Sequence, residues 1–320
     1  MQPDYRQLSK TFDALLNGYE RITIISHIHP DADAIGTALG VYHWLRERGR
    51  RVEVANASAD VPRYLDFLPG FGKIKTRIDF DDSLIISCDC GSIDRLGFDL
   101  EGRTIVNIDH HASTVPFGTL NVVDSKAVAS AEVAYYLLTD LHPLSAQSAT
   151  AFYAALVSDT RNFTTGNMNA GVFALAQELV GYGVNIPEVT RQMLHRRSLA
   201  SLRILGEAIA SLELVDNAQI AIMTVRREDR LRWGARISDL DGIVDYGRSL
   251  VTVRIALMLA EYDGYIKVSL RSKGLDVLRI ARHFGGGGHR EAAGFEVEGG
   301  TIEQVRTDVL TYIRSKRWPE

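Results

Sequence analysis

Short apolar runs alternate with helical patterns through the first half of the chain. The runs at 22–25 and 83–88 are almost wholly apolar, which is typical of strands buried on both faces. After the first run, apolar residues recur at helical spacing at Ile35, Leu39 and Tyr42. Alternating strands and helices predict an α/β domain whose largely parallel sheet is flanked by helices. The predicted strands are 22–25, 52–55, 83–88 and 104–108, and the predicted helices are 5–18, 34–47, 128–139, 145–157 and 168–183.

The pattern changes near residue 190, where a charged helical stretch begins. A chain of 320 residues is longer than one compact core usually spans. We therefore predict an N-terminal domain at 1–190, a helical connector at 191–212 and a smaller C-terminal α/β domain at 213–320. In the C-terminal domain, strands are predicted at 219–225, 251–261, 265–271 and near 295–297, and helices at 226–234, 238–248, 275–284 and 301–316.

The overall charge restricts the class of partner. The formal net charge is −4 and the sequence pI is about 6.2. A chain without a global basic field is a poor ligand for long duplex DNA. Small anionic substrates stay compatible with this charge, because local arginines or bound metal ions can offset the repulsion.

The sequence favours a cytoplasmic protein without a membrane partner. The N-terminal stretch carries acidic residues and lacks the apolar core of a signal peptide. The longest apolar candidate, 250–260, is interrupted by Arg254, so no membrane span is predicted. Cys88 and Cys90 are too close in sequence to staple distant segments, which fits a reducing compartment.

Imidazole and carboxylate side chains follow the first predicted strand. His27, Asp31 and Asp33 lie between its carboxyl end and the next helix, the position where open α/β sheets bind ligands. Such side chains suit a divalent cation. We expect Asp31 and Asp33 to point to one face of an extended segment, where they would repel each other without a cation. The alternative is a polar loop with Asp33 as an ordinary helix N-cap.

Two further strands end in side chains of the same kind. Asp89 follows strand 83–88; it is either a metal ligand or a turn residue before Gly91. The flanking cysteines are expected to be small buried residues, because thiolates are soft ligands among hard carboxylates. Strand 104–108 ends in Asp109, His110 and His111. Adjacent histidines diverge on an extended backbone, so we expect one to bind metal and the other to face substrate.

Three weaker signals occur later in the chain. Asp159 ends a predicted helix, where an Asp-Thr pair is more often a cap. The glycine run 285–288 is followed by His289 and Arg290; it is either a flexible linker or a segment whose backbone N–H groups approach phosphate. Arg271, at the end of a predicted strand, is a second candidate anion contact.

Taken together, these motifs resemble those of the DHH phosphoesterase superfamily over nearly the whole chain. Ser26–Asp33 resembles its first motif, Asp89 its second, Asp109–His111 the motif that names it, and Asp159–Thr160 its fourth. The segment 285–294 resembles the DHH-associated substrate-binding domain. Size and domain pairing look most like the bifunctional oligoribonucleases and pAp phosphatases, or nanoRNases.

The resemblance implies two divalent cations, most often Mn²⁺, with Mg²⁺ or Co²⁺ as alternatives. It assigns His27, Asp31 and Asp89 to one ion. It assigns Asp33, Asp89, His110 and Asp159 to the other, with Asp89 bridging. It also implies that Asp89 and His111 are catalytic, with His111 near the scissile phosphate. The substrate-binding residues would be Arg271, Gly287, Gly288, His289 and Arg290, with the active site in a cleft between the domains.

The implied activity is hydrolysis of short oligoribonucleotides to mononucleotides and of pAp to AMP, by water that two metal ions activate. Short RNA, pAp or dinucleotides would be the substrates, and a homodimer is possible. One alternative is a phosphodiesterase for cyclic di-AMP or pApA, which the sequence does not separate from the first. Another is a nucleotide sensor without turnover, against which the intact ligand set argues. A Rossmann-type redox protein is disfavoured because the first turn lacks the G-x-G-x-x-G motif.

Overall fold

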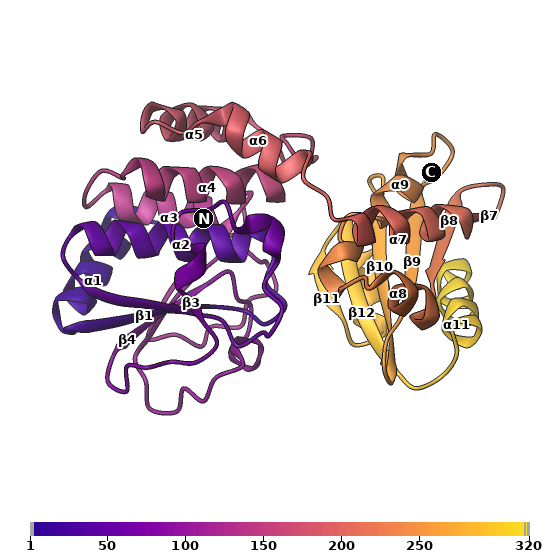
Figure 1. Cartoon of the computed structure of the whole chain (residues 1–320), viewed down its shortest axis with the longest axis horizontal. Coiled ribbons are helices and arrows are strands. Elements are labelled where there is room, and N and C mark those ends of the chain that lie inside the picture. The colour runs from indigo at the N-terminus through magenta and orange to yellow at the C-terminus, as the bar shows by residue number, and fades with distance from the viewer. Residues whose placement is uncertain (1–2, 317, 319–320) are drawn as a thin grey trace. The chain divides into compact units, whose positions relative to one another are not determined.

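The computed structural model describes residues 3–316 and 318 and divides into two compact units (Figure 1). The N-terminal unit is Met1–Arg196 and the C-terminal unit is Arg197–Glu320. The connector predicted at 191–212 is not one helix. The end of α6 (Ile186–Leu194) and α7 (Leu199–Ala210) are separated by the non-helical segment 195–198. No helix in the described part of the chain is both long and apolar enough to cross a membrane.

The N-terminal unit contains a six-stranded sheet in the order β3-β2-β1-β4-β5-β6. Every pairing in it is parallel, as the buried apolar strands predicted. This is the order of doubly wound dinucleotide-binding sheets, in which the strand order reverses beside the first strand. The strands are β1 (Arg21–Ser26), β2 (Arg51–Ala55), β3 (Ile74–Lys75), β4 (Leu84–Cys88), β5 (Ile105–Asp109) and β6 (Leu120–Val123).

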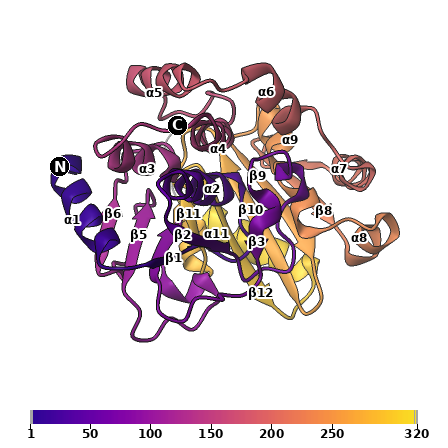
Figure 2. The same cartoon turned by 60° about the vertical axis from the view of Figure 1, so that its left-hand side comes forward.

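Helices cover one face of this sheet, and loops with short helical turns cover the other. Helices α2 (Ala32–Glu47) and α4 (Ala146–Asp159) pack so closely that a Cβ atom at Gly36 would lie 2.6 Å from the carbonyl oxygen of Ala151. Helices α5 and α6 form a further layer over α4 (Figure 1), and α1 lies beside β6 (Figure 2). On the opposite face, Ile25 and Ile85 pack with Leu96 of the short helix η3. The remaining elements of the unit are α1 (Tyr5–Asn17), α2 (Ala32–Glu47), η1 (Arg63–Leu65), η2 (Phe71–Lys73), η3 (Ile93–Leu96), α3 (Ser130–Thr139), α4 (Ala146–Asp159) and α5 (Ala170–Gly181).

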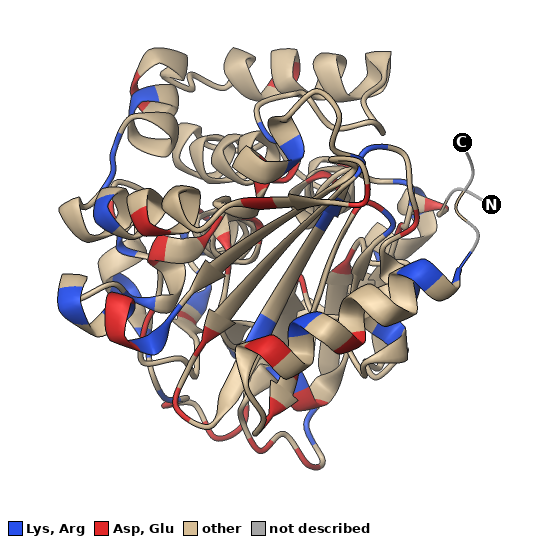
Figure 3. Cartoon of the chain, turned by 90° about the vertical axis from the view of Figure 1, so that its right-hand side faces the viewer, with Lys and Arg blue, Asp and Glu red and all other residues tan. Residues whose placement is uncertain are grey.

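The C-terminal unit contains a second six-stranded sheet, in the order β11-β12-β10-β9-β8-β7. Only the β8–β9 pairing is parallel among its described strands. Each face has its own apolar core, and acidic and basic residues are interspersed along the surface helices (Figure 3). The strands are β7 (Glu213–Val215), β8 (Ile220–Val225), β9 (Ile255–Glu261), β10 (Tyr265–Ser272), β11 (Gly287–His289) and β12 (Ala292–Glu298). The helices besides α7 are α8 (Arg227–Trp233), η4 (Ile237–Leu240), α9 (Val244–Ser249), α10 (Leu278–His283) and α11 (Ile302–Ser315).

Four strands, β3, β6, β7 and β11, escaped prediction. Strands β3 and β7 are only 2 and 3 residues long, and the sequences of the other two carry little strand pattern. Strand β6 is only Leu120–Val123 and contains a polar Asn121. Strand β11 is mostly glycine, which has low strand propensity, and it forms through backbone pairing with β12. The interpretation of the glycine run as a flexible linker is therefore wrong, because its last two glycines begin a strand.

Candidate metal centre

The first metal-ligand candidate lies directly after β1. His27 is buried, its Nδ1 atom is 2.7 Å from the carbonyl oxygen of Ile28, and its Nε2 atom is 3.5 Å from Asp89 Oδ2. Arg95 Nη2, which can only donate, lies 3.1 Å from the same Nδ1 atom. Nε2 is the nitrogen that faces Asp89, and binding of a metal ion there would require that nitrogen to be free of its proton.

The local geometry expected for Asp31 and Asp33 is wrong in detail. Helix α2 begins at Ala32, before the predicted start at 34, and Asp31 is its N-cap, accepting a hydrogen bond of 3.0 Å from Ala34 N–H. Asp33 lies within the first helical turn and is not the N-cap. On a helix, residues two apart do not face the same way. The two carboxylates therefore join different groups.

Asp31 and Asp33 belong to different groups of possible metal ligands, each with its donor atoms within 4.8 Å of one another. The first contains His27, Asp31 and Asp89, and the second contains Asp33, His110 and Asp159; a further group contains Asp89, Asp109 and His111. Asp159, the last residue of α4, lies 3.3 Å from His110 Nε2. Thr160 fulfils the capping role considered for this pair, because its hydroxyl donates to the Leu156 carbonyl at 2.6 Å.

Asp89 stands between the two groups. It follows β4, is buried, and has a φ of 57°, an uncommon conformation outside glycine. Its Oδ2 atom faces His27 at 3.5 Å, whereas its Oδ1 atom lies 3.7 Å from His110 Nε2. One carboxylate therefore directs an oxygen toward each group, which is the arrangement of a bridging ligand.

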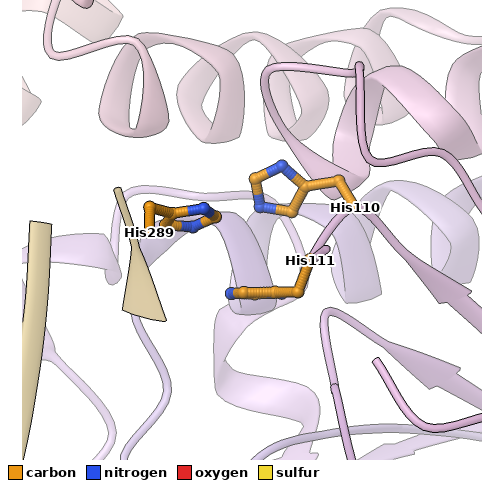
Figure 4. Close-up of side chains that lie close together, drawn as sticks. All are labelled: His110, His111 and His289. Carbon is orange, nitrogen blue, oxygen red and sulfur yellow. The ribbon is translucent and has the colours of Figure 1, made fainter. Parts of the chain in front are cut away.

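The second motif histidine is held differently. His111 Nδ1 is 2.8 Å from Asp109 Oδ1, and its side chain is 20% exposed, against 5% for His110. Figure 4 shows the two rings leaving adjacent positions of the chain; their centroids are 4.8 Å apart and their planes are inclined by 64°. The two side chains therefore do not diverge as expected, because both lie near Asp89 Oδ1, at 3.7 and 3.6 Å. They differ in their other carboxylate partner, which is Asp159 for His110 and Asp109 for His111.

The electrostatics of the site favour a cation. Burial and the nearby charges of Asp89 and Asp159 raise the pKa of Asp33 well above its ordinary value. Burial acts in the same direction on Asp89, but the hydrogen bond to His27 and the charges of three histidines lower its pKa overall. The imidazoles therefore supply positive charge in the metal-free protein. Divalent cations could replace it, because metal binding displaces such protons.

The two glycines predicted to bind substrate, Gly287 and Gly288, differ in whether the fold leaves room for a side chain. Gly288 has a φ of 127°, and a Cβ atom there would lie 2.6 Å from the carbonyl oxygen of Ala292. Gly287 is exposed, and a Cβ atom there would have no described neighbour within 4 Å. The fold therefore requires glycine at 288 but not at 287.

The predicted cationic residues lie at the same end of the C-terminal sheet. Arg271 of β10 pairs with Ala292 of β12, and Ala292 pairs with His289 of β11. Directly opposite residues share a face of the sheet, so Arg271 and His289 flank Ala292 on one face. Arg271 lies 3.7 Å from the carboxylate of Asp245, and Arg290, in the adjoining turn, contacts the Gly274 carbonyl at 3.3 Å.

Three buried polar residues of the site region were not assigned a role from the sequence. Asp109 orients His111, and Ser130, the first residue of α3, contacts two of the candidate ligands. Asn56 donates hydrogen bonds to Ser26 Oγ at 2.9 Å and to the His27 carbonyl at 2.8 Å. Only Asp109 carried a signal, because it belongs to a strand-end motif. Serine and asparagine are common in loops and at helix ends without any ligand.

Comparison with known proteins finds two matching domain families and relatives similar over most of the chain. The model of the DHH family N-terminal domain matches residues 21–157, and that of the DHHA1 domain matches residues 217–315. The bifunctional oligoribonuclease and PAP phosphatase NrnA of Thermus thermophilus is 30% identical, over 98% of this chain and 96% of that protein. The protein of the same name from Bacillus subtilis is 27% identical, over 87% of this chain and 90% of that one.

A solved structure agrees with this placement. The exopolyphosphatase-related protein of Bacteroides fragilis superposes with a TM-score of 0.85 at 25% identity, covering 96% of both chains. Both domain models match in order, and the relatives are similar over nearly their whole length. The chain therefore belongs to the DHH family, with an N-terminal DHH domain and a C-terminal DHHA1 domain.

Proposed function

We propose that this protein is a metal-dependent phosphoesterase that hydrolyses short oligoribonucleotides to mononucleotides and pAp to AMP. The names of its relatives supply the substrate class, since those from Thermus thermophilus and Bacillus subtilis are called oligoribonuclease and PAP phosphatase. We also propose the cytoplasm as its compartment, because short RNA fragments arise there.

The observation that carries the proposal is the position of Asp89. Its two oxygens face two separate ligand groups, which supports a pair of cations that share one carboxylate. We assign one ion to His27, Asp31 and Asp89, and the other to Asp33, Asp89, His110 and Asp159. Oxygen and imidazole donors of this kind suit Mn²⁺, which we propose as the metal.

Bound divalent cations would activate water and offset negative charge on the phosphoryl oxygens. The protein's own contribution is to hold the ligands and to orient His111. Asp109 accepts a hydrogen bond from Nδ1 of His111, which fixes the ring plane and leaves Nε2 as the atom we assign to the substrate. There it would steady the scissile phosphate or the leaving oxygen, and both Asp89 and His111 count as catalytic residues.

The C-terminal unit would bind the rest of the substrate. Arg271 and His289 share a face of the sheet, and Gly287, Gly288 and Arg290 adjoin His289 in the chain. Phosphate binds where backbone N–H groups and basic side chains converge. A Cβ atom at Gly287 would have no described neighbour within 4 Å, so the backbone there is open to a ligand. The lack of a side chain at this position leaves that space free for phosphate.

Product analysis of the purified protein tests the proposal. The protein with Mn²⁺ is offered pAp, pApA, cyclic di-AMP and a ladder of short RNAs at equal concentration. AMP from pAp, together with mononucleotides from the shortest RNAs, is the expected result. Rapid loss of cyclic di-AMP would instead identify a signalling phosphodiesterase, and absence of cleavage with Mn²⁺, Mg²⁺ or Co²⁺ would refute a metal-dependent phosphoesterase.

A further inference from the structure

The amino end of α3 meets the metal-ligand groups at Ser130. The N-cap of α3 is Ala129, whose side chain cannot accept a hydrogen bond from the first helical N–H groups. Asp33, from α2, takes that role: its Oδ2 accepts from Ser130 N–H at 2.6 Å, and its Oδ1 accepts from Ala131 N–H at 3.2 Å. One candidate metal ligand is thus fixed by the backbone of α3.

The side chain of Ser130 fixes a second candidate ligand. Its hydroxyl lies 2.7 Å from Asp89 Oδ1, and the residue is fully buried. The hydroxyl is the donor and the carboxylate oxygen the acceptor in this hydrogen bond. Ser130 therefore holds the carboxylates of Asp33 and Asp89 at once, one through its N–H group and the other through its hydroxyl.

The oxygen that Ser130 contacts is the one whose direction matters. Asp89 Oδ1 faces His110 at 3.7 Å and His111 at 3.6 Å, whereas Oδ2 faces His27 at 3.5 Å. A hydrogen bond to Oδ1 sets the rotation of the carboxyl group about its Cβ–Cγ bond, and so decides that each oxygen faces one ligand group. We propose that Ser130 is a positioning residue that keeps Asp89 in the bridging orientation for two cations. This inference rests on the metal-dependent function proposed above.

Two observations indicate that Ser130 does more than stabilise α3. A serine is not needed there to cap α3, because the cap is provided by Asp33. The hydroxyl donates to Asp89, outside its own helix, whereas that of Thr139 in the same helix donates to the Tyr135 carbonyl at 2.8 Å. Partners that orient a metal ligand from outside typically change metal affinity about 10- to 100-fold when removed.

The test is Mn²⁺ binding to Ser130→Ala, followed through the electron paramagnetic resonance signal of free Mn²⁺ without substrate. We expect Mn²⁺ to bind about 10- to 100-fold more weakly. The matched control is Ser148→Ala, which removes another fully buried hydroxyl, one that donates to the Gly40 carbonyl at 3.0 Å. It should bind Mn²⁺ as the wild type does.

Equal Mn²⁺ affinity in Ser130→Ala and Ser148→Ala would overturn the inference. If Ser130→Ala does not fold in EDTA, Ser130→Cys takes its place, because a thiol keeps the volume but donates weakly; wild-type affinity of that variant would refute the role of the hydroxyl. Wild-type binding of Mn²⁺ and hydrolysis of pAp are measured in parallel. Their loss would reject the proposed function, whereas their presence beside an unaffected Ser130→Ala would reject only this inference.

Discussion

Gly287 and Gly288 are neighbours in sequence, yet alanine should affect them in opposite ways. At Gly288, alanine would adopt a φ of 127° and bring its Cβ atom within 2.6 Å of the Ala292 carbonyl oxygen and 2.7 Å of Ala293 Cα. A strained φ and an overpacked contact each cost about 1–3 kcal/mol. We therefore expect Gly288→Ala to lower the free energy of unfolding by about 2–6 kcal/mol.

At Gly287, alanine meets no described atom within 4 Å. The free energy of unfolding should stay unchanged or rise by up to about 1 kcal/mol, because alanine restricts the unfolded chain. Substrate binding should suffer instead. A hydrogen bond to a charged group is worth about 1.5–3 kcal/mol, so loss of one backbone contact to phosphate should raise KM about 10- to 100-fold.

Urea denaturation and initial rates on pAp measure the two effects separately. Gly206→Ala is the control, since its Cβ atom would also have no described neighbour within 4 Å and it lies in α7 of the same unit. An unchanged KM in Gly287→Ala would remove that residue from the substrate site. Wild-type stability in Gly288→Ala would refute the backbone geometry of β11 on which the comparison depends.

Three other changes give distinct outcomes. Asp89→Asn should lower kcat on pAp at least about 100-fold, because an amide is a poor bridge between cations; retention of most of the wild-type rate would exclude bridging. Asp109→Asn should lower kcat about 10- to 100-fold while Mn²⁺ affinity, measured by calorimetry, stays near wild type, because Asp109 acts through His111; weaker Mn²⁺ binding would instead make it a ligand. Adding Mn²⁺ to EDTA-treated protein should raise the melting temperature in differential scanning fluorimetry, by an amount equivalent to about 2.7 kcal/mol at a hundredfold excess over the dissociation constant; no shift with Mn²⁺ would mean that the buried carboxylates need no cation.

The sheet and the placement of the candidate ligands followed from a simple regularity in the sequence. The apolar strands β1 and β4 are followed directly by His27 and Asp89, respectively, and β5 ends at Asp109, followed by His110 and His111. These strands are neighbours in a parallel sheet, so their carboxyl ends lie along one edge and bring the side chains together. The parallel sheet is confirmed. The roles of the individual ligands stay predictions, although the structure gathers them into two groups.

Local backbone geometry was less accessible from the sequence. Asp31 and Asp33 were expected on an extended segment because both follow a strand, but the helix begins between them, at Ala32. Competing caps two residues apart are hard to rank from the sequence, because either aspartate is a favourable N-cap. An extended segment would have pointed both carboxylates to one face, whereas in the structure they lie in different groups of possible ligands.

The contacts that orient the ligands come from residues far apart in the chain. Ser130 reaches Asp33 and Asp89 across 97 and 41 positions of sequence, and neither distance is visible in any local pattern. Asp109 could be identified in the sequence as part of a motif. Its role in orienting the His111 ring depends on a hydrogen bond that forms only in the folded chain. A metal ligand can be recognised in the sequence because it is a carboxylate or imidazole at the end of a strand. A residue that orients such a ligand needs only one hydrogen-bond donor or acceptor in the right place. The first kind can be identified from sequence, and the second must be found from the packing of α3 against the sheet edge.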